Sequence, residues 1–308
     1  MSYLASLNPM NLFGSLPGNI AQGLIWGLMA LGVYITFRLL DFADLTVDGT
    51  FATGGAVTVV LILHGWSAPA ALLVAVLAGL AAGLITGLLH TLLGIPPILA
   101  GILTQIALYS INLNIMGMAN LAVSVDNYPL ILSLRKVTQS ILISLIFAAV
   151  IIAILYWYFG TEQGSSIRAT GCNPAMSKAQ GININFTKVL ALAISNGLVG
   201  LSGGLMAQYQ GFSDINMGRG AIVIGLAAVI IGEVIFSKLF TNFGLKLLAV
   251  SIGAVIYYFV LQIVLQLGLN TNDLKLITAL IVALFLAIPY WKGKMFRGKA
   301  KKEETHHA

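Results

Sequence analysis

Three carboxylates fall within eight residues of this chain, at Asp41, Asp44 and Asp48, with hydroxyl side chains such as Thr46 and Thr53 beside them. A carboxylate at the start of a helix accepts hydrogen bonds from the unpaired N–H groups of the first turn. In an apolar setting, carboxylates can instead bind a cationic group such as an ammonium. The residues leave both roles open, although Asp48 precedes a glycine, which suits capping of the helix that follows.

A second set of polar side chains recurs about every three to four positions, so part of it shares one face of a helix. The set consists of Gln105, Tyr109, Asn112 and Asn114. Amides on one helix face suit either a polar pathway or hydrogen bonds between helices. The same two interpretations apply to Asn196, Gln208 and Tyr209.

The composition defines the environment of these side chains. Of 308 residues, 16 are Lys or Arg and 10 are Asp or Glu, so 8% are charged, while 58% are hydrophobic. The mean hydropathy is +0.95. Since soluble domains have about 25% charged residues, these values exclude a soluble enzyme, a disordered chain and a disulfide-stapled secreted domain. Strict apolar–polar alternation is missing as well, so the sequence predicts an all-α, polytopic membrane protein.

Nucleic-acid and metal binding are not predicted. The net charge is +6, but the basic residues lie between apolar runs and in the tail rather than on one face. Cys172 is the single cysteine, and His64 and His90 lack neighbouring ligands.

Nine apolar segments approach the length of about 20 residues that a membrane-spanning helix needs. They are Ile20–Leu40, Thr50–His64, Pro69–His90, Pro96–Gly117, Gln139–Gly160, Val189–Gln210, Gly220–Phe236, Gly244–Gly268 and Leu276–Trp291. The second and seventh are short, which predicts halves of broken helices. Small residues at four-residue spacing, at Ala75, Gly79, Gly83 and Gly87 and at Gly23 and Gly27, predict close helix packing.

Basic residues predict the orientation of these segments. With the N-terminus outside and the C-terminus in the cytoplasm, 12 basic residues fall inside and 4 outside. This distribution obeys the positive-inside rule. The first apolar segment has no basic region before it, which predicts a retained span rather than a cleaved signal peptide.

The two halves of the chain resemble each other. Phe42–Leu45 recurs as Phe212–Ile215 at an offset of 170 residues, and Gly55 corresponds to Gly225 at the same offset. With the predicted orientation, this pattern indicates an inverted repeat of four spans plus four, as is common in transport proteins. The predicted single transmembrane domain covers residues 1–291. It divides into repeat one (18–117), a connector span (139–160), a loop (161–188) and repeat two (189–291), before a basic cytoplasmic tail (292–308).

The loop between the halves contains a well-specified short helix. Asn173 suits an N-cap, Pro174 suits the first helical position, and Gly181 suits the stop. These signals predict a helix over Pro174–Gln180, which on its own is also typical of an ordinary capped connector.

The loop resembles the coupling motif of permease subunits of ABC importers, in the branched-chain amino acid and ribose permease family. The resemblance covers about residues 17–290, and the run Leu40–Ala56 is similar to the subgroup that transports tryptophan or tyrosine. Cys172 and Ser177 depart from the usual pattern of the loop. The matching positions are Arg168, Ala169, Gly171, Asn173, Pro174, Ala179, Gly181 and Ile182.

The resemblance implies a bacterial plasma-membrane importer of an amino acid. Two copies of this chain would form the pore, and two cytoplasmic ATPase subunits would hold ATP and Mg and dock near Arg168 and Lys178. An extracellular or periplasmic binding protein would deliver substrate around Asp214 and Arg219. The chain itself has no GxxxxGK[ST] phosphate loop, so no ATPase activity and no cofactor of its own are expected.

The expected substrate pathway combines the polar sets described above. Its candidate residues are Asp44, Thr46, Asp48, Thr53, Gln105, Tyr109, Asn112, Asn196, Gln208 and Asp214. Alternatives are an ion-coupled secondary transporter, a structural scaffold, or the same ABC permease role for a sugar, a nucleoside or a branched-chain amino acid. The capped loop helix favours the importer, because a secondary transporter needs no docking helix.

Overall fold

The computed structural model describes residues 9–125, 127–236 and 239–266, and a few positions between 276 and 287. Over these residues the chain is a bundle of helices with one short two-stranded ribbon. Seven helices are long and apolar enough to cross a membrane, which confirms a multi-spanning α-helical protein.

The element bounds agree with the predicted segments to within a few residues in most cases. The long helices are α1 (Pro9–Tyr34, continued by the π-helical turn η2, Ile35–Leu39), α2 (Thr46–Leu63), α3 (Ala68–Thr91), α4 (Pro97–Met116), α5 (Val137–Phe159), α8 (Ile184–Gln210) and α10 (Phe243–Gln266). The shorter helices are α6 (Glu162–Cys172), α7 (Pro174–Ala179) and α9 (Ala221–Phe236). The strands β1 (Asn120–Ala122) and β2 (Phe212–Asp214) pair antiparallel.

Helix α2 differs from its prediction in both its start and its length. The helix expected to begin at Thr50 begins at Thr46 and is 18 residues long, so it is a full candidate span rather than a short half. Asp48 therefore lies inside the first turn of α2 and is not its N-cap. The ninth predicted segment, Leu276–Trp291, lies largely outside the described residues.

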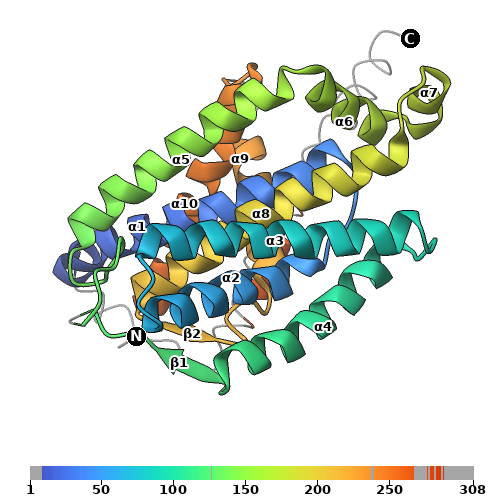
Figure 1. Ribbon diagram of the computed structural model, residues 1–308. Helices are drawn as coiled ribbons and strands as arrows, with labels where there is room; N and C mark the ends of the chain where they lie inside the picture. Colours follow the sequence, from blue (N-terminus) through green and yellow to red (C-terminus); the bar gives the residue numbers. More distant parts are fainter. Residues whose placement is uncertain are drawn as a thin grey trace, which may run out of the picture.

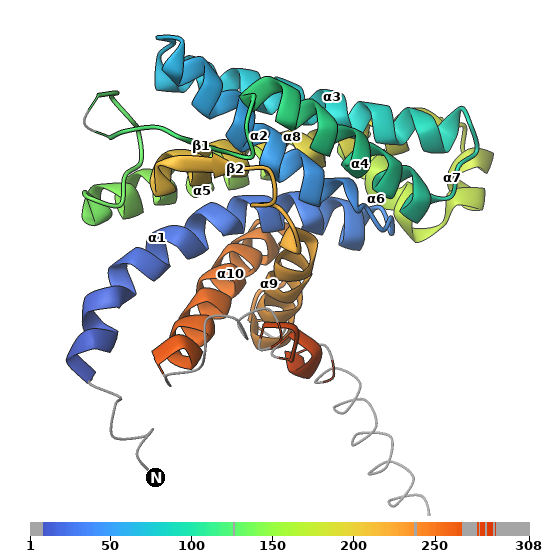
Figure 2. The same cartoon turned by 90° about the horizontal axis from the view of Figure 1, so that it is seen from below.

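Helices α1 and α8 form the centre of the bundle. In each, 83% of the apolar stretch is buried, against 22% in α5. Figure 2 shows α2, α3 and α4 on one side of α1, and α9 and α10 on the other. Figure 1 shows α6 and α7 together at one end of the bundle, while the β1–β2 ribbon lies toward the other end.

Small residues allow the closest helix contacts, as predicted. A Cβ atom added at Gly79 or Gly83 of α3 would collide with the main-chain carbonyls of Asn196 or Leu192 in α8. Gly23 of α1 approaches the backbone of α10 in the same way. Because hydrocarbon provides little hydrophobic drive between helices, such close backbone approach supplies the packing energy.

Candidate functional site

The N-terminal ends of α2 and α9 meet inside the bundle through Asp48. One carboxylate oxygen of Asp48 accepts a hydrogen bond from the Gly220 N–H (2.9 Å), and the other accepts from the Ile222 N–H (2.9 Å). The first N–H groups of a helix have no intrahelical partners and favour negative charge. Asp48 therefore caps α9, a helix in the other half of the chain, rather than the helix that contains it.

A cavity of about 330 Å³ lies beside this junction. Its volume is at the lower end of the range of about 300–1,000 Å³ that small-molecule sites occupy. It brings together four residues of the predicted pathway, namely Asp48, Gln105, Tyr109 and Asn112. The full lining is Asp48, Gly49, Gln105, Ile106, Tyr109, Ser110, Asn112, Ile215 and Arg219.

The amide of Asn112 is an unsatisfied polar group in the cavity wall. Asn112 is 1% exposed, and among the described residues neither its oxygen nor its nitrogen has a hydrogen-bond partner. An unpaired buried polar group costs about 1–3 kcal/mol. Such a cost in a native structure calls for an explanation in function, such as a ligand or water that completes the hydrogen bonds.

Arg219 is the cation of the same cavity. It lies on the segment between β2 and α9, one residue before the Gly220 N–H that Asp48 binds. Within the described chain the only salt bridge joins Arg38 and Glu233 (2.8 Å), so Arg219 and Asp48 share a cavity without forming an ion pair.

A buried polar cluster lies near the start of α2, apart from the cavity. Asp44 is 1% exposed; one of its carboxylate oxygens accepts from the Thr46 N–H (2.9 Å) and the other from the Asn196 side-chain amide (2.7 Å). The Asn196 oxygen accepts in turn from the Thr50 hydroxyl (2.7 Å). Burial raises the pKa of the Asp44 carboxyl above its ordinary value. Since its members satisfy one another, this cluster joins helices.

Two threonines outside the predicted pathway, Thr86 and Thr104, extend the polar contacts. The hydroxyl oxygen of Thr86 in α3 lies 2.7 Å from that of Thr46 and 2.9 Å from that of Thr104 in α4. Thr86 continues the face of α3 that carries Gly79 and Gly83. The small residues on that face predicted a contact with another helix. A hydroxyl group on the same face could have been predicted to take part in that contact.

The remaining pathway candidates lie outside the cavity lining, although the buried side-chain nitrogen of Gln208 has no hydrogen-bond partner among the described residues. The Thr53 hydroxyl donates to the Gly49 carbonyl (3.0 Å) within α2. The Gln208 oxygen accepts from the Ile131 N–H (3.0 Å), which fixes the loop between β1 and α5. The cavity lining thus includes neither these residues nor Asp44, Thr46, Asn196 and Asp214.

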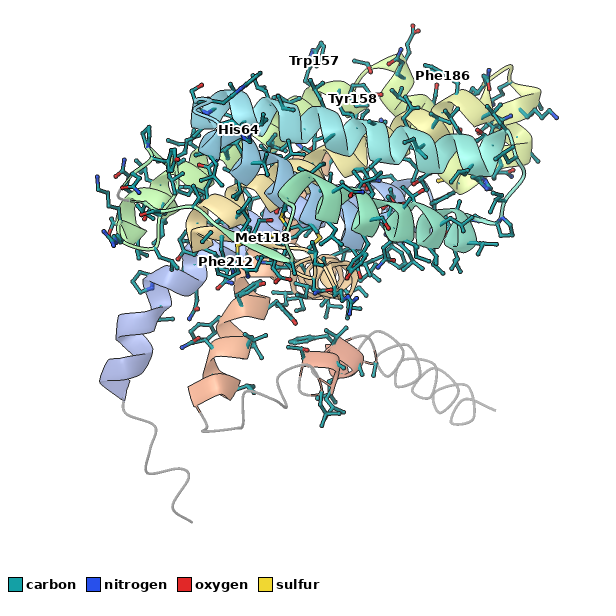
Figure 3. The ribbon with its side chains drawn as sticks, turned by 60° about the horizontal axis from the view of Figure 1, so that its bottom comes forward. His64, Met118, Trp157, Tyr158, Phe186 and Phe212 are labelled. Atoms are coloured by element: carbon teal, nitrogen blue, oxygen red, sulfur yellow. The ribbon has the colours of Figure 1, made fainter. Side chains whose placement is uncertain are left out.

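Asp214 lies in the ribbon. One of its carboxylate oxygens accepts from the Asn216 N–H (2.7 Å), and the other accepts from the Asn120 side-chain amide (3.3 Å). In Figure 3, Met118 and Phe212 both lie at the ribbon, and Phe186 lies at the end of the bundle that carries α7. The candidate residues therefore fall at the two ends of the molecule and at one cavity between them.

The loop helix forms where its signals predicted it. The Asn173 side-chain oxygen accepts from the Met176 N–H (3.0 Å), and Pro174 is the first helical residue. Gly181 follows the last turn with φ +84°, a conformation that other residues rarely adopt. The side chains of Lys178 and Ala179 are exposed, so α7 protrudes from this end of the bundle.

The helix before it, α6, is attached firmly to the bundle. The Arg168 guanidinium donates to the Phe159 carbonyl (2.8 Å) at the end of α5 and lies over the Phe243 ring of α10, 5.5 Å from its centroid. The backbone of Gly171 touches the Leu39 carbonyl at the end of η2. Arg168 and Gly171 therefore connect this loop to three helices of their own chain. Ala169 and Ile182 are half-buried.

Sequence comparison gives matches to known proteins over most of this chain. Residues 17–288 match the profile of a protein family described as "Branched-chain amino acid transport system / permease component". The chain is 42% identical to a tyrosine transport system permease protein of Clostridioides difficile, over 87% of this chain and 89% of that relative.

Two further relatives differ in how much they cover. An uncharacterised protein of Rickettsia prowazekii is 36% identical over 87% of this chain and 95% of its own length. A nucleoside ABC transporter permease protein of Lactococcus lactis is 34% identical, but over 28% of each chain. The extensive matches thus run through both halves of the chain, including α7 and the cavity.

Proposed function

The chain belongs to the family of permease components of branched-chain amino acid transport systems, and we propose that it is the membrane subunit of an ATP-driven importer of an aromatic amino acid. The observation that carries this proposal is the 42% identity with a tyrosine transport permease over most of both chains. The seven apolar helices agree with a multi-pass protein of the bacterial plasma membrane. The nucleoside permease matches too short a stretch to favour a nucleoside.

In the proposed mechanism, α7 transmits movement from separate ATPase subunits, which hold ATP and Mg. The helix is exposed, capped at Asn173 and stopped at Gly181, so it can take up a push as a rigid unit. Helix α6 carries that movement to α1, α5 and α10 through Arg168 and Gly171, and α8 carries it to the centre of the bundle. Substrate would cross without covalent chemistry, as the cavity opens first to one side and then to the other.

The inverted repeat is part of this proposal, and matching hydrogen bonds support it. Asp44 and Asp214, 170 positions apart, each accept an N–H from the residue two positions on. Each also accepts an asparagine side-chain amide, from Asn196 and Asn120 respectively.

Helix packing supports the repeat as well. The offset of 170 residues relates α1 to α8, α2 to α9 and α3 to α10. The packing of α3 on α8 then corresponds to that of α10 on α1, and both contacts are extensive in this bundle. Helix α5 has no counterpart in the repeat and connects its two halves. By the distribution of basic residues, the α6–α7 end faces the cytoplasm and the ribbon faces outside.

The partners follow from this orientation. A second copy of the chain would complete the pore, and a solute-binding protein would deliver the amino acid at the ribbon end, near Asp214 and Arg219. Two ATPase subunits would dock at the opposite end, around α7 and Lys178.

Reconstitution tests the proposed function. Proteoliposomes holding the chain, its ATPase subunits and its binding protein should take up L-tyrosine or L-tryptophan only with ATP, while the chain alone hydrolyses none. Gly181→Trp and Pro174→Asp should reduce uptake while ATP hydrolysis continues. Uptake driven by a proton or sodium gradient through the chain alone would overturn the proposal, and unchanged uptake in both variants would overturn the coupling role of α7.

A further inference from the structure

We propose that the cavity between α2, α4 and the start of α9 binds the charged end of a free amino acid, with Arg219 holding the carboxylate and Asp48 the ammonium. The inference rests on the proposed function and deepens it. The membrane subunit would then recognise an α-amino acid itself, in addition to any selection by a binding protein.

Two opposite charges line this cavity. Arg219 and Asp48 line the same cavity, yet they form no salt bridge with each other. Arg219 is exposed and Asp48 is half-buried at this cavity. Two opposite charges that share a cavity without pairing can each bind a ligand group of the opposite sign. A zwitterion placed between them satisfies both, because a guanidinium forms a two-pronged contact with a carboxylate and a carboxylate accepts from an ammonium.

The local structure keeps the carboxylate of Asp48 in place for this role. Its two oxygens each accept one main-chain N–H, from Gly220 and Ile222. A carboxylate offers about four acceptor positions, so these bonds orient it and leave others for a ligand. Arg219 directly precedes Gly220, and the same two bonds therefore hold its backbone near Asp48.

Asn112 supplies an independent observation. Its amide lines the cavity, is 1% exposed, and has no partner for either polar atom among the described residues. An amide offers two donor hydrogens and an acceptor oxygen. It can therefore bind a carboxylate oxygen, an ammonium hydrogen, or both ends of one zwitterion. Gln105, on the same helix and in the same lining, provides a second amide.

The remaining lining suits the side chain of an apolar or aromatic amino acid. Tyr109 is 40% exposed, and Ile106 and Ile215 provide apolar contact. Aromatic rings stack or pack edge to face at such surfaces. A neutral sugar would leave Arg219 and Asp48 unpaired, so the charge pattern selects against it.

Ligand analogues test the site in the unaltered protein. Purified full-length chain is heated in detergent with L-tyrosine, tyramine (no carboxylate) or 3-(4-hydroxyphenyl)propionate (no ammonium), each at the same concentration. L-Tyrosine should raise the unfolding midpoint, and neither analogue should do so. Equal shifts from all three compounds, or no shift with L-tyrosine, L-tryptophan or L-leucine, would overturn the site.

Variants test it in the complete transporter. In the proteoliposomes described above, Arg219→Gln should reduce L-tyrosine uptake at least tenfold, and Arg219→Lys should reduce it less. Lys136→Gln, which removes one exposed positive charge from the same end of the molecule, should stay within twofold of the wild type.

Uptake by Arg219→Gln within twofold of wild type would overturn the site while the proposed function stands. Wild-type vesicles that import no aromatic amino acid would overturn the function, and the heating assay would still judge the site.

Discussion

The carboxylate of Asp48 accepts the N–H of Gly220, a residue 172 positions farther along the chain, at 2.9 Å. This bond joins the first turn of α2 to the start of α9, and thus joins the two halves of the protein beside the cavity. One side chain therefore both fixes the start of a helix and contributes the negative charge of the cavity wall. The two roles that the sequence left open for this carboxylate are compatible in a single geometry.

Removing this carboxylate should destabilise the protein. Asp48→Ala leaves the N–H groups of Gly220 and Ile222 without their acceptor, at a cost of about 1–2 kcal/mol, as for other lost helix caps. Asp48→Asn keeps one acceptor oxygen and should lose about half as much. In thermal unfolding in detergent, the midpoint should fall in the order wild type, Asp48→Asn, Asp48→Ala. Asp41→Asn, the same change at an exposed carboxylate, serves as the control, and an equal effect there would contradict the capping role.

The buried carboxyl of Asp44 should make stability depend on pH. Burial raises its folded-state pKa above the ordinary value of 3.8, so the fold favours the protonated acid. Its contribution to stability is then complete below pH 3.8 and is lost as pH rises through the raised pKa. Asp44→Asn removes this titration.

The pH test compares unfolding midpoints of wild type and Asp44→Asn between pH 4 and pH 8. The variant loses hydrogen bonding at every pH, since its amide nitrogen cannot accept from the Thr46 N–H or the Asn196 amide. The difference in unfolding midpoint between wild type and variant should shrink as pH rises, because only the wild type loses the contribution of the titrating carboxyl. Parallel curves would contradict the prediction.

Added volume at the contact of α3 with α8 should also be costly. A Cβ at Gly83 would meet the Leu192 carbonyl, which is main chain and cannot turn away. Gly83→Val should therefore cost about 1–3 kcal/mol or more, as overpacked cores do. Ala81→Val places the same side chain on the exposed face of the same helix and should change stability by less than about 0.5 kcal/mol. Similar unfolding midpoints for the two variants would show that the helices can separate without cost.

Signals carried by local chemistry were sufficient to predict much of this architecture. The lengths of the apolar runs predicted the long helices, and the glycine spacing predicted the face of α3 that packs closely on another helix, but not that α8 is its partner. The N-cap, proline and glycine around Asn173, Pro174 and Gly181 gave the loop helix, because each acts on its own turn of the backbone.

Long-range partners could not be predicted in this way. The acceptor role of Asp48 toward α9 depends on two helices meeting across the bundle, and no local pattern near Asp48 encodes it. The same applies to Thr86, whose hydroxyl finds partners on α2 and α4. Helical spacing placed Gln105, Tyr109 and Asn112 on one α-helix, but which residues from other elements would complete their cavity was decided by packing alone.

The two basic residues of the cytoplasmic loop should respond differently to the loss of their charge. Arg168 donates to the Phe159 carbonyl and lies over the Phe243 ring, so it joins α6 to α5 and α10. Lys178 is exposed on α7, and its ammonium has no partner within the described chain.

We therefore expect Arg168→Gln to lower the unfolding midpoint of the purified chain, by an amount that corresponds to about 1 kcal/mol. Lys178→Gln should leave that midpoint unchanged and instead weaken binding of the ATPase subunits, measured by co-purification at rising salt, which screens an exposed charge. If Lys178→Gln also lowered the midpoint, or if neither variant altered assembly or uptake, the separate roles assigned to α6 and α7 would be wrong.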